Sequence, residues 1–305
     1  MTACAVVHFA EGAAPAARLA DHCRVPVHPV EVHAFPDGES LVRVPACPET
    51  VLLYRSLDRP NAKLVEVLFA AAALRDRGAR RVILVAPYLA YMRQDMAFHE
   101  GEAVSQKVIG SLLAAHFEGV VTVDPHLHRT AALAEVVPGS PAIAASAAPL
   151  LATALADGLD PRTVLVGPDV ESRQWVESIA APLGLEVLVG AKRRCGDRSV
   201  HCTIPDVERV RGRPAVLVDD CVSSGTTLVE CAGLLHAAGA VSCEAIVTHC
   251  LAGPADLRSI RQGGVLRLRA TDSTASPAGT IELAPVLAAA IGAAGWTARP
   301  AHRPS

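Results

Sequence analysis

The feature that most constrains the fold of this chain is the regular alternation of short apolar runs with longer Ala- and Leu-rich stretches. Runs such as Val51–Tyr54, Arg81–Ala86 and Ala215–Val218 are almost continuously apolar and show no alternation of apolar and polar positions. Such runs are typical of strands that are covered on both faces. The stretches between them, such as Asn61–Arg77 and Thr227–Ala238, have the composition of helices. This order predicts βαβ units and mostly parallel sheets.

The chain also repeats itself loosely, which indicates two related α/β domains. The pair RRVILVAPYLAYMRQD and GVVTVDPHLHRT has a counterpart in RTVLVGPDVESRQW and PAVLVDDCVSSGTT. In each pair a strand ends in a polar loop, and a second strand follows with an acidic residue at its end. We therefore predict an α/β fold of two domains, each with a mostly parallel sheet flanked by helices, over residues 1–142 and 143–296, with a tail at 297–305.

The composition argues against several classes of protein. The chain has 28 Lys and Arg against 31 Asp and Glu, whereas a general nucleic-acid-binding protein needs a basic surplus. No apolar run reaches the length of a membrane span, and the N-terminus lacks the basic-then-apolar pattern of a signal peptide. The nine Cys include no C-x-x-C pair, which favours reduced thiols. We expect a cytoplasmic protein that binds neither nucleic acid nor membrane.

The strongest candidate for a ligand site is the segment Val216–Leu228, where two carboxylates, Asp219 and Asp220, end an apolar strand. A loop of small and hydroxyl residues follows and leads into a helix: Ser223, Ser224, Gly225, Thr226 and Thr227. Small residues allow backbone N–H groups to surround a phosphate, and a helix N-terminus adds partial positive charge. Because carboxylates accept hydrogen bonds from sugar hydroxyls, the segment indicates a ribose 5-phosphate site. The alternative is that the two carboxylates only cap a turn.

The familiar nucleotide-binding motifs are absent from the sequence. It contains neither G-x-G-x-x-G nor G-x-x-x-x-G-K-[ST], so a Rossmann dinucleotide site and a P-loop are unsupported. If ATP binds, other residues must hold it.

Other short motifs occur in a fixed order with the sugar-phosphate loop. They are Phe35–Glu39, Pro87–Tyr88 with Met92–Asp95, Val123–His126, Gly167–Asp169 and Lys192–Arg194. The loop resembles that of type I phosphoribosyltransferases, and the whole set resembles the ribose-phosphate diphosphokinases, or phosphoribosyl-diphosphate synthetases. Ser223 and the segment 96–104 are similar to the archaeal-type members. The resemblance implies two phosphoribosyltransferase-like domains, and an enzyme of nucleotide biosynthesis that uses Mg²⁺ to move the diphosphate of ATP to C1 of ribose 5-phosphate.

The resemblance also assigns residues to ATP binding. Asp37, Gly38 and Glu39 match the ATP-binding loop, while Arg93 and Gln94 match the pair that contacts the nucleotide. From the local sequence alone, the first group forms a β-turn and the second a solvated loop. In the family the ATP-binding loop reaches a neighbouring subunit's site. We therefore expect a homo-oligomer with the ATP site near a subunit interface.

The last two groups assigned by the resemblance concern the metal and the transferred phosphorus. His126 and Asp169 match the magnesium-linked positions. Imidazole is a poor direct partner for Mg²⁺, so His126 is expected to act through a metal-bound water or a phosphate. Lys192 and Arg194 match the catalytic basic loop and suit the neutralisation of phosphate charge. The polar, Gly-containing segment Cys195–Cys202 is expected to be a mobile lid.

Two other functions stay open at this point. A phosphoribosyltransferase that consumes the activated sugar would need the same sugar loop, although a single domain would suffice for it. A non-catalytic homologue that regulates an active synthetase should have lost the basic or metal-linked residues. Lys192, Arg194, His126 and Asp169 are all present, which argues against this last function.

Overall fold

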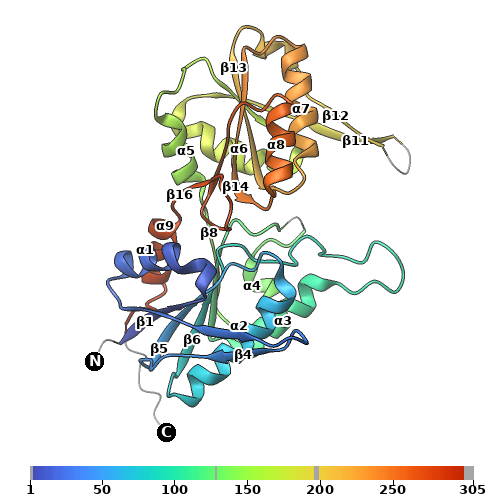
Figure 1. Ribbon diagram of the computed structural model, residues 1–305. Helices are drawn as coiled ribbons and strands as arrows, with labels where there is room; N and C mark the ends of the chain where they lie inside the picture. Colours follow the sequence, from blue (N-terminus) through green and yellow to red (C-terminus); the bar gives the residue numbers. More distant parts are fainter. Residues whose placement is uncertain (1–2, 128, 196–198, 299–305) are drawn as a thin grey trace. The chain divides into compact units, whose positions relative to one another are not determined.

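The structure, a computed structural model, describes residues 3–127, 129–195 and 199–298, and only the backbone in the described part of 192–201. Contacts divide the chain into two units, of which the first comprises Met1–Ser146 with Leu283–Ser305 and the second comprises Ala147–Glu282. Each unit is built around its own six-stranded sheet (Figure 1). The predicted α/β fold with two parallel sheets flanked by helices is therefore confirmed.

The sheet of the first unit is parallel throughout, in the order β2-β1-β5-β6-β7-β8. Its strands are β1 (Cys4–His8), β2 (Val27–Pro29), β5 (Thr50–Tyr54), β6 (Arg81–Val85), β7 (Gly119–Val123) and β8 (Ala142–Ala145). Its helices are α1 (Ala13–Cys23), α2 (Pro60–Asp76), α3 (Ser105–His116), α4 (Leu133–Val136) and α9 (Ala284–Ala293). Strands β3 (Glu31–Ala34) and β4 (Ser40–Arg43) form a separate antiparallel hairpin.

The sheet of the second unit is also parallel, in the order β10-β9-β13-β14-β15-β16. Its strands are β9 (Val164–Gly167), β10 (Glu186–Val189), β13 (Pro214–Val222), β14 (Ser242–Cys250), β15 (Leu268–Thr271) and β16 (Gly279–Ile281). Its helices are α5 (Ala148–Ala156), α6 (Arg173–Ala180), α7 (Thr226–Ala237) and α8 (Pro254–Gln262). Strands β11 (Ala191–Cys195) and β12 (Ser199–Thr203) form a second antiparallel hairpin.

The burial of the central strands explains their unalternated sequences. Every residue of β1, β5, β7 and β9 is buried, because helices cover both faces of each sheet. Side chains of β5 and β6 pack with those of α2 and α3 in one apolar cluster, while β9, β13 and β14 pack with α7 in another. No helix in the described part of the chain is long and apolar enough to cross a bilayer.

The C-terminal helix belongs to a different unit from the one that the sequence suggested. We expected the second domain to continue to residue 296, whereas α9 packs against α1 and the sheet of the first unit (Figure 1). Trp296 is buried, and a Cβ added at Gly119 would lie 2.6 Å from its ring. Arg81 Nη2 donates to the carbonyl oxygen of Ala298 at 2.7 Å. Of the expected tail, residues 299–305 lie outside the described residues.

The first boundary also falls later than expected, at 146/147 instead of 142/143. Strand β8 accounts for the difference, because its residues Ala142–Ala145 pair in parallel with Val120–Val123 of β7 and so complete the first sheet. This stretch is rich in Ala and Pro, which are uncommon in strands, so its composition did not predict the short edge strand.

Candidate active site

The predicted sugar-phosphate loop connects β13 to α7 at the carboxyl edge of the second sheet, where ligands of open α/β sheets bind. Asp219 and Asp220 lie within β13, which continues for two residues beyond Asp220 to Val222, so the carboxylates do not end the strand as expected. Residues 223–225 make the turn, and Thr226 begins the helix. A hollow of about 70 Å³ lies over this loop, and it is lined by Asp219 and residues 221–228.

The backbone at this turn suits a phosphate. Ser223 and Ser224 are exposed, and the Oγ of Ser224 lies 3.1 Å from Oγ1 of Thr226. No side chain caps the N-terminus of α7, because Gly225 occupies the N-cap position. The first N–H groups of the helix therefore have no capping side chain, and together with the hydroxyl groups they can donate to phosphate oxygens.

Gly225 is required at the turn for two reasons. Its φ of +78° lies in the left-handed region, and a Cβ there would lie 2.2 Å from Cγ1 of Ile260 in α8. The close approach of Ile260 thus leaves no room for a side chain at this position.

Gly225→Ala is expected to destabilise the protein by about 2 kcal/mol or more, because the methyl group meets both backbone strain and the side chain of Ile260. Denaturant unfolding measures the loss. Gly233→Ala is the matched control, since Gly233 lies inside the same helix with nothing within 4 Å of its added Cβ. Equal losses in the two variants would contradict this account of the turn.

Three carboxylates meet at this edge of the second sheet. Burial raises the pKa of Asp219, and the charges of Asp220 and Asp169 raise it further. Asp169 follows β9, the neighbour of β13, and its Oδ1 accepts from the N–H groups of Glu171 and Ser172 at 3.0 and 3.1 Å. Three acidic side chains this close together form an environment that a hard cation or sugar hydroxyl groups would stabilise.

These oxygen donors fit Mg²⁺ in their chemistry. Among the described residues, no group of three or more His, Cys, Asp or Glu is placed to hold a metal ion by itself. Mg²⁺ characteristically takes one or two carboxylates and completes its shell with water and substrate phosphates. A site with Asp169 beside Asp219 and Asp220 therefore suits Mg²⁺ that arrives with a phosphorylated substrate.

The expected nucleotide residues Arg93 and Gln94 lie in the loop between β6 and α3 of the first unit. Arg93 is exposed. Oε1 of Gln94 accepts from the backbone N–H of Ser105 at 3.2 Å and also bonds the Ser105 hydroxyl. This oxygen holds the loop to the start of α3, so the amide nitrogen of Gln94 is the group that can face a nucleotide.

His126 is half-buried in the loop after β7, and this loop is tied to the loop of Arg93 and Gln94. Arg129 Nη1 donates to Oδ1 of Asp95 at 2.7 Å, and Thr130 Oγ1 donates to Oε1 of Gln106 at 3.2 Å. The sequence interpretation included Asp95 only as the end of the motif Met92–Asp95 and gave it no role, and it did not single out Gln106 or Arg129. The available signal for Gln106 and Arg129 was that they lie close to the motifs in the sequence.

The segment of Asp37, Gly38 and Glu39 is the turn of the β3–β4 hairpin, as its local sequence suggested. The Gly38 N–H donates to the Phe35 carbonyl at 3.0 Å, and the Glu39 N–H donates to Oδ1 of Asp37 at 3.1 Å. Gly38 has a φ of +93°, which explains its presence in the turn. All of residues 31–39 are exposed, so the hairpin presents these groups to ligands or to another chain.

Lys192 and Arg194 lie in a strand and not in the loop that we expected. Both belong to β11, where Lys192 is paired with Cys202 and Arg194 with Val200 of β12. The hairpin extends away from the second sheet (Figure 1). Positions 192 and 194 share one face of the strand because their separation is two residues. The tip of the expected lid, residues 196–198, lies outside the described residues.

The carboxyl edge of the second sheet holds a further polar network that the sequence interpretation missed. Ser273 Oγ lies 2.9 Å from Nδ1 of His249 and donates to the Thr248 carbonyl at 3.2 Å. Thr271 and Thr274 donate to the carbonyls of Thr248 and Cys250, both at 2.5 Å. These buried side chains fix the ends of β14 and β15 beside the sugar loop. The polar run after Ala270 was the available signal.

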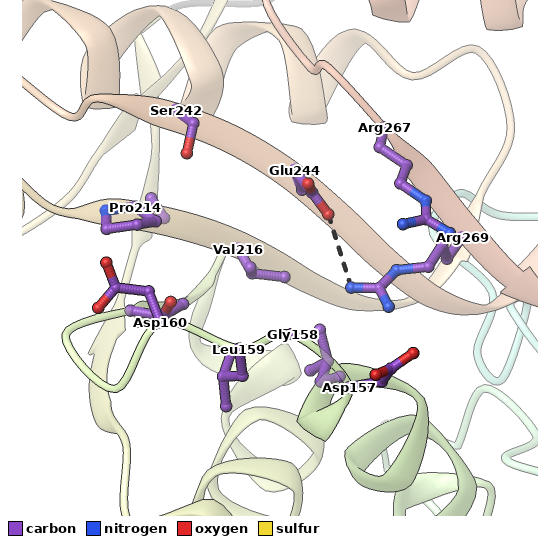
Figure 2. Close-up of a pocket in the computed structure, with 13 residues that line it drawn as sticks. Asp157, Gly158, Leu159, Asp160, Pro214, Val216, Ser242, Glu244, Arg267 and Arg269 are labelled. Carbon is purple, nitrogen blue, oxygen red and sulfur yellow. Dashed lines mark ion pairs between the residues drawn. The ribbon is translucent and has the colours of Figure 1, made fainter.

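A larger hollow than the one over the sugar loop lies elsewhere in the second unit. A cavity of about 270 Å³ is lined by Pro214 and Ser242, the first residues of β13 and β14, with Asp157, Arg267 and Arg269 around it (Figure 2). It is therefore at the amino ends of the strands, opposite the sugar loop. Arg269 and Glu244 in its lining form an ion pair, at 3.5 Å. Although this cavity is larger than the hollow over the sugar loop, it lies at the end of the sheet where ligands of open α/β sheets do not bind.

Comparison with known proteins identifies the family. Residues 5–116 match the N-terminal domain of ribose phosphate pyrophosphokinase, and residues 139–265 match the phosphoribosyl transferase domain. A ribose-phosphate pyrophosphokinase of Methanopyrus kandleri is 35% identical to this chain over 293 residues, which are 94% of this chain and 98% of that protein. The chain belongs to the ribose-phosphate pyrophosphokinase family.

Other members of the family extend the comparison. The ribose-phosphate pyrophosphokinase of Methanothermobacter thermautotrophicus is 36% identical over 90% of this chain and 94% of its own length. Both relatives are archaeal, in agreement with the resemblance of the loops. The crystal structure of phosphoribosylpyrophosphate synthetase from Mycobacterium smegmatis matches 96% of this chain and 98% of its own with a TM-score of 0.80 and 23% identity, which shows a shared fold.

Proposed function

We propose that this chain is a ribose-phosphate diphosphokinase, which transfers the diphosphate of ATP to the C1 hydroxyl of ribose 5-phosphate for nucleotide biosynthesis. The products are 5-phosphoribosyl 1-diphosphate and AMP. The observation that carries the proposal is the presence of a sugar-phosphate loop on the second unit together with a first unit that matches the pyrophosphokinase N-terminal domain over residues 5–116. A phosphoribosyltransferase would need only the first of these.

The second unit would bind ribose 5-phosphate. The loop Ser223–Thr227 and the N-terminus of α7 would hold the 5-phosphate through hydroxyl and backbone N–H donors. Asp219 and Asp220, which precede this loop, would accept hydrogen bonds from the ring hydroxyls. The geometry favours an anion over the loop and hydrogen-bond donors over the carboxylates, which matches the two ends of this sugar.

The nucleotide would be bound by residues of the first unit, Arg93 and Gln94, and by Asp37, Gly38 and Glu39 of the exposed hairpin. Mg²⁺, when bound with the phosphates, would neutralise part of their charge. Asp169 would hold it directly, and His126 would act through a metal-bound water or a phosphate oxygen.

The transfer itself needs charge neutralisation and alignment, and no protein nucleophile. The C1 oxygen would form a bond to the β-phosphorus while the bond from that phosphorus to the α,β-bridging oxygen breaks, and AMP leaves. Lys192 and Arg194, on one face of β11, would stabilise the charge on the oxygens of the β-phosphorus.

The exposed apolar residues of the first unit support a homo-oligomer with the ATP site near an interface. Phe35 and Leu41 of the hairpin region are 40% and 48% exposed, and Val65 and Phe69 of α2 are both 47% exposed. Apolar side chains gathered at a hairpin and the helix that contacts it favour burial by a second copy.

The described cysteines are free thiols, which supports a reducing compartment such as the cytoplasm.

One assay tests the function against its alternatives. The purified chain, incubated with ribose 5-phosphate, ATP and Mg²⁺, is expected to release AMP, measured by chromatography, together with an equal amount of 5-phosphoribosyl 1-diphosphate, measured by ³¹P NMR. A requirement for a nucleobase and the preformed diphosphate would identify a phosphoribosyltransferase. No AMP release, combined with co-purification of an active synthetase, would identify a regulatory homologue.

A further inference from the structure

Two cysteine sulfurs lie in contact where the β11–β12 hairpin meets helix α7 of the second unit. Cys202 is in β12 and Cys231 is in α7, and their Sγ atoms are 3.1 Å apart. The Sγ of Cys202 also lies 3.4 Å from the carbonyl oxygen of Pro168. A disulfide requires about 2.05 Å between sulfurs, so an approach of roughly 1 Å would join residues that are far apart in the sequence.

The two cysteines lie next to the basic strand β11 and in the helix that follows the sugar-phosphate loop. Cys202 is the direct partner of Lys192 in the β11–β12 register. Cys231 lies in the second turn of α7, the helix that begins at Thr226 of the sugar loop. A covalent bond between them would connect the strand that pairs with the basic residues to the helix that follows the sugar-phosphate loop.

We propose that Cys202 and Cys231 are an oxidisable dithiol, which hydrogen peroxide converts to a disulfide that holds the β11–β12 hairpin against α7. The part of this proposal that concerns turnover rests on the proposed function, because it requires the hairpin to move Lys192 and Arg194 during the reaction. The formation of the bond itself does not.

The two cysteines differ in access, which sets the order of the chemistry. Cys202 is half-buried, whereas Cys231 has no exposed surface. Peroxide would oxidise the Cys202 thiol to a sulfenic acid and release one water. The Cys231 sulfur would then attack the Cys202 sulfur, forming the S–S bond and releasing a second water. In sum, two thiols lose two electrons and two protons, and one hydrogen peroxide becomes two waters.

The hydrogen bond with Cys202 and burial both raise the pKa of the Cys231 thiol. The second step needs a thiolate as the nucleophile. Disulfide formation is therefore expected to be slow at neutral pH and to become faster as the pH rises. A slow step of this kind suits a response to sustained oxidant and spares the enzyme in ordinary reducing conditions.

The experiment oxidises the full-length protein with hydrogen peroxide, alkylates the remaining thiols and digests it without reduction. Mass spectrometry is expected to find one peptide pair joined through Cys202 and Cys231, lighter by two hydrogens. Hydrogen exchange of the backbone amides of β11 and β12 is expected to slow, and AMP-forming turnover is expected to fall several-fold. Dithiothreitol should restore all three.

The variants Cys202→Ala and Cys231→Ala are expected to form no cross-link and to keep their turnover and exchange rates after mild peroxide treatment. Cys243→Ala is the matched control, since Cys243 is a fully buried thiol in β14. It should respond as the wild type does. Melting temperatures of the reduced variants show whether each is folded, and the wild-type measurements stand without them.

Two results would overturn the proposal. One is the absence of a cross-link between Cys202 and Cys231 under conditions that oxidise other thiols. The other is a cross-linked protein in which the backbone amides of the hairpin exchange, and AMP is formed, at the rates of the reduced protein. If the reduced chain releases no AMP at all, the proposed function fails, and the cross-link and exchange measurements still decide whether the dithiol restrains the hairpin.

Discussion

Replacing Lys192 or Arg194 by Ala is expected to lower kcat for AMP formation by about a hundredfold or more. Each substitution would remove a positive side chain that stabilises the oxygens of the transferring phosphorus. Both positions lie on the same face of β11. The hairpin lies apart from the six-stranded sheet (Figure 1), so the melting temperature should stay close to that of the wild type. Steady-state kinetics at saturating ATP and ribose 5-phosphate measure the loss.

Arg193→Ala is the control for this prediction. Residue 193 lies between the two basic positions but on the other face of the strand, so its loss should change kcat much less. Near-wild-type turnover in both Lys192→Ala and Arg194→Ala would contradict the assigned roles. Equal losses of kcat in all three variants would indicate that the total charge of the hairpin matters, and that the face of the strand on which each charge lies does not.

Asp219→Asn is expected to raise the melting temperature at neutral pH while it weakens the use of ribose 5-phosphate. Burial and the charges of Asp220 and Asp169 raise the pKa of Asp219, so its ionised form destabilises the folded state. Each kcal/mol of removed penalty corresponds to roughly 2 to 4 °C in a chain of this size. The amide would also place donors where sugar hydroxyls need acceptors, so KM for ribose 5-phosphate should increase.

The pH dependence of this effect follows from the direction of the shift. Unfolded, Asp219 ionises near its ordinary value of 3.8, whereas in the folded state it retains its proton to higher pH. The wild type therefore loses stability as pH rises from about 4 through the folded-state pKa. Below that range the wild type and Asp219→Asn should converge, and above it their difference in free energy of unfolding should be constant.

Thermal unfolding across this pH range, with and without Mg²⁺, measures these differences. Mg²⁺ should raise the melting temperature of the wild type more than that of Asp219→Asn, since the variant carries less negative charge at the site. Asp157→Asn is the control, because Asp157 is exposed at the opposite end of the sheet. A gain in stability from Asp157→Asn as large as that from Asp219→Asn would contradict the electrostatic explanation.

The sugar-phosphate loop was predictable because its requirements are local. A strand, two carboxylates, small residues and a helix start are consecutive in the sequence, and the structure places Asp219, Gly225 and Thr226 accordingly. The need for glycine at position 225 was only partly local. Its left-handed φ suits a turn, but the contact that forbids a Cβ comes from Ile260, which is distant in the sequence.

The basic segment shows where local interpretation failed. The resemblance placed Lys192 and Arg194 in a catalytic basic loop, and three consecutive cations after Gly190 and Ala191 do not indicate a strand. They form β11 because residues 199–203 pair with them in an antiparallel register. Because this hairpin lies outside the six-stranded sheet, its strands lack the continuous apolar run of strands that are covered on both faces, so the sequence carried little signal of it.

The sequence by itself determined the fold class and the location of the sugar loop, since both follow from the spacing of apolar runs and from consecutive residues at strand ends. Tertiary structure alone decided which unit α9 completes and that Cys202 meets Cys231. An Ala- and Leu-rich helix can cover almost any apolar face, and a contact between two side chains depends on how strands and helices pack. Such choices depend on the whole core, and no short segment contains them.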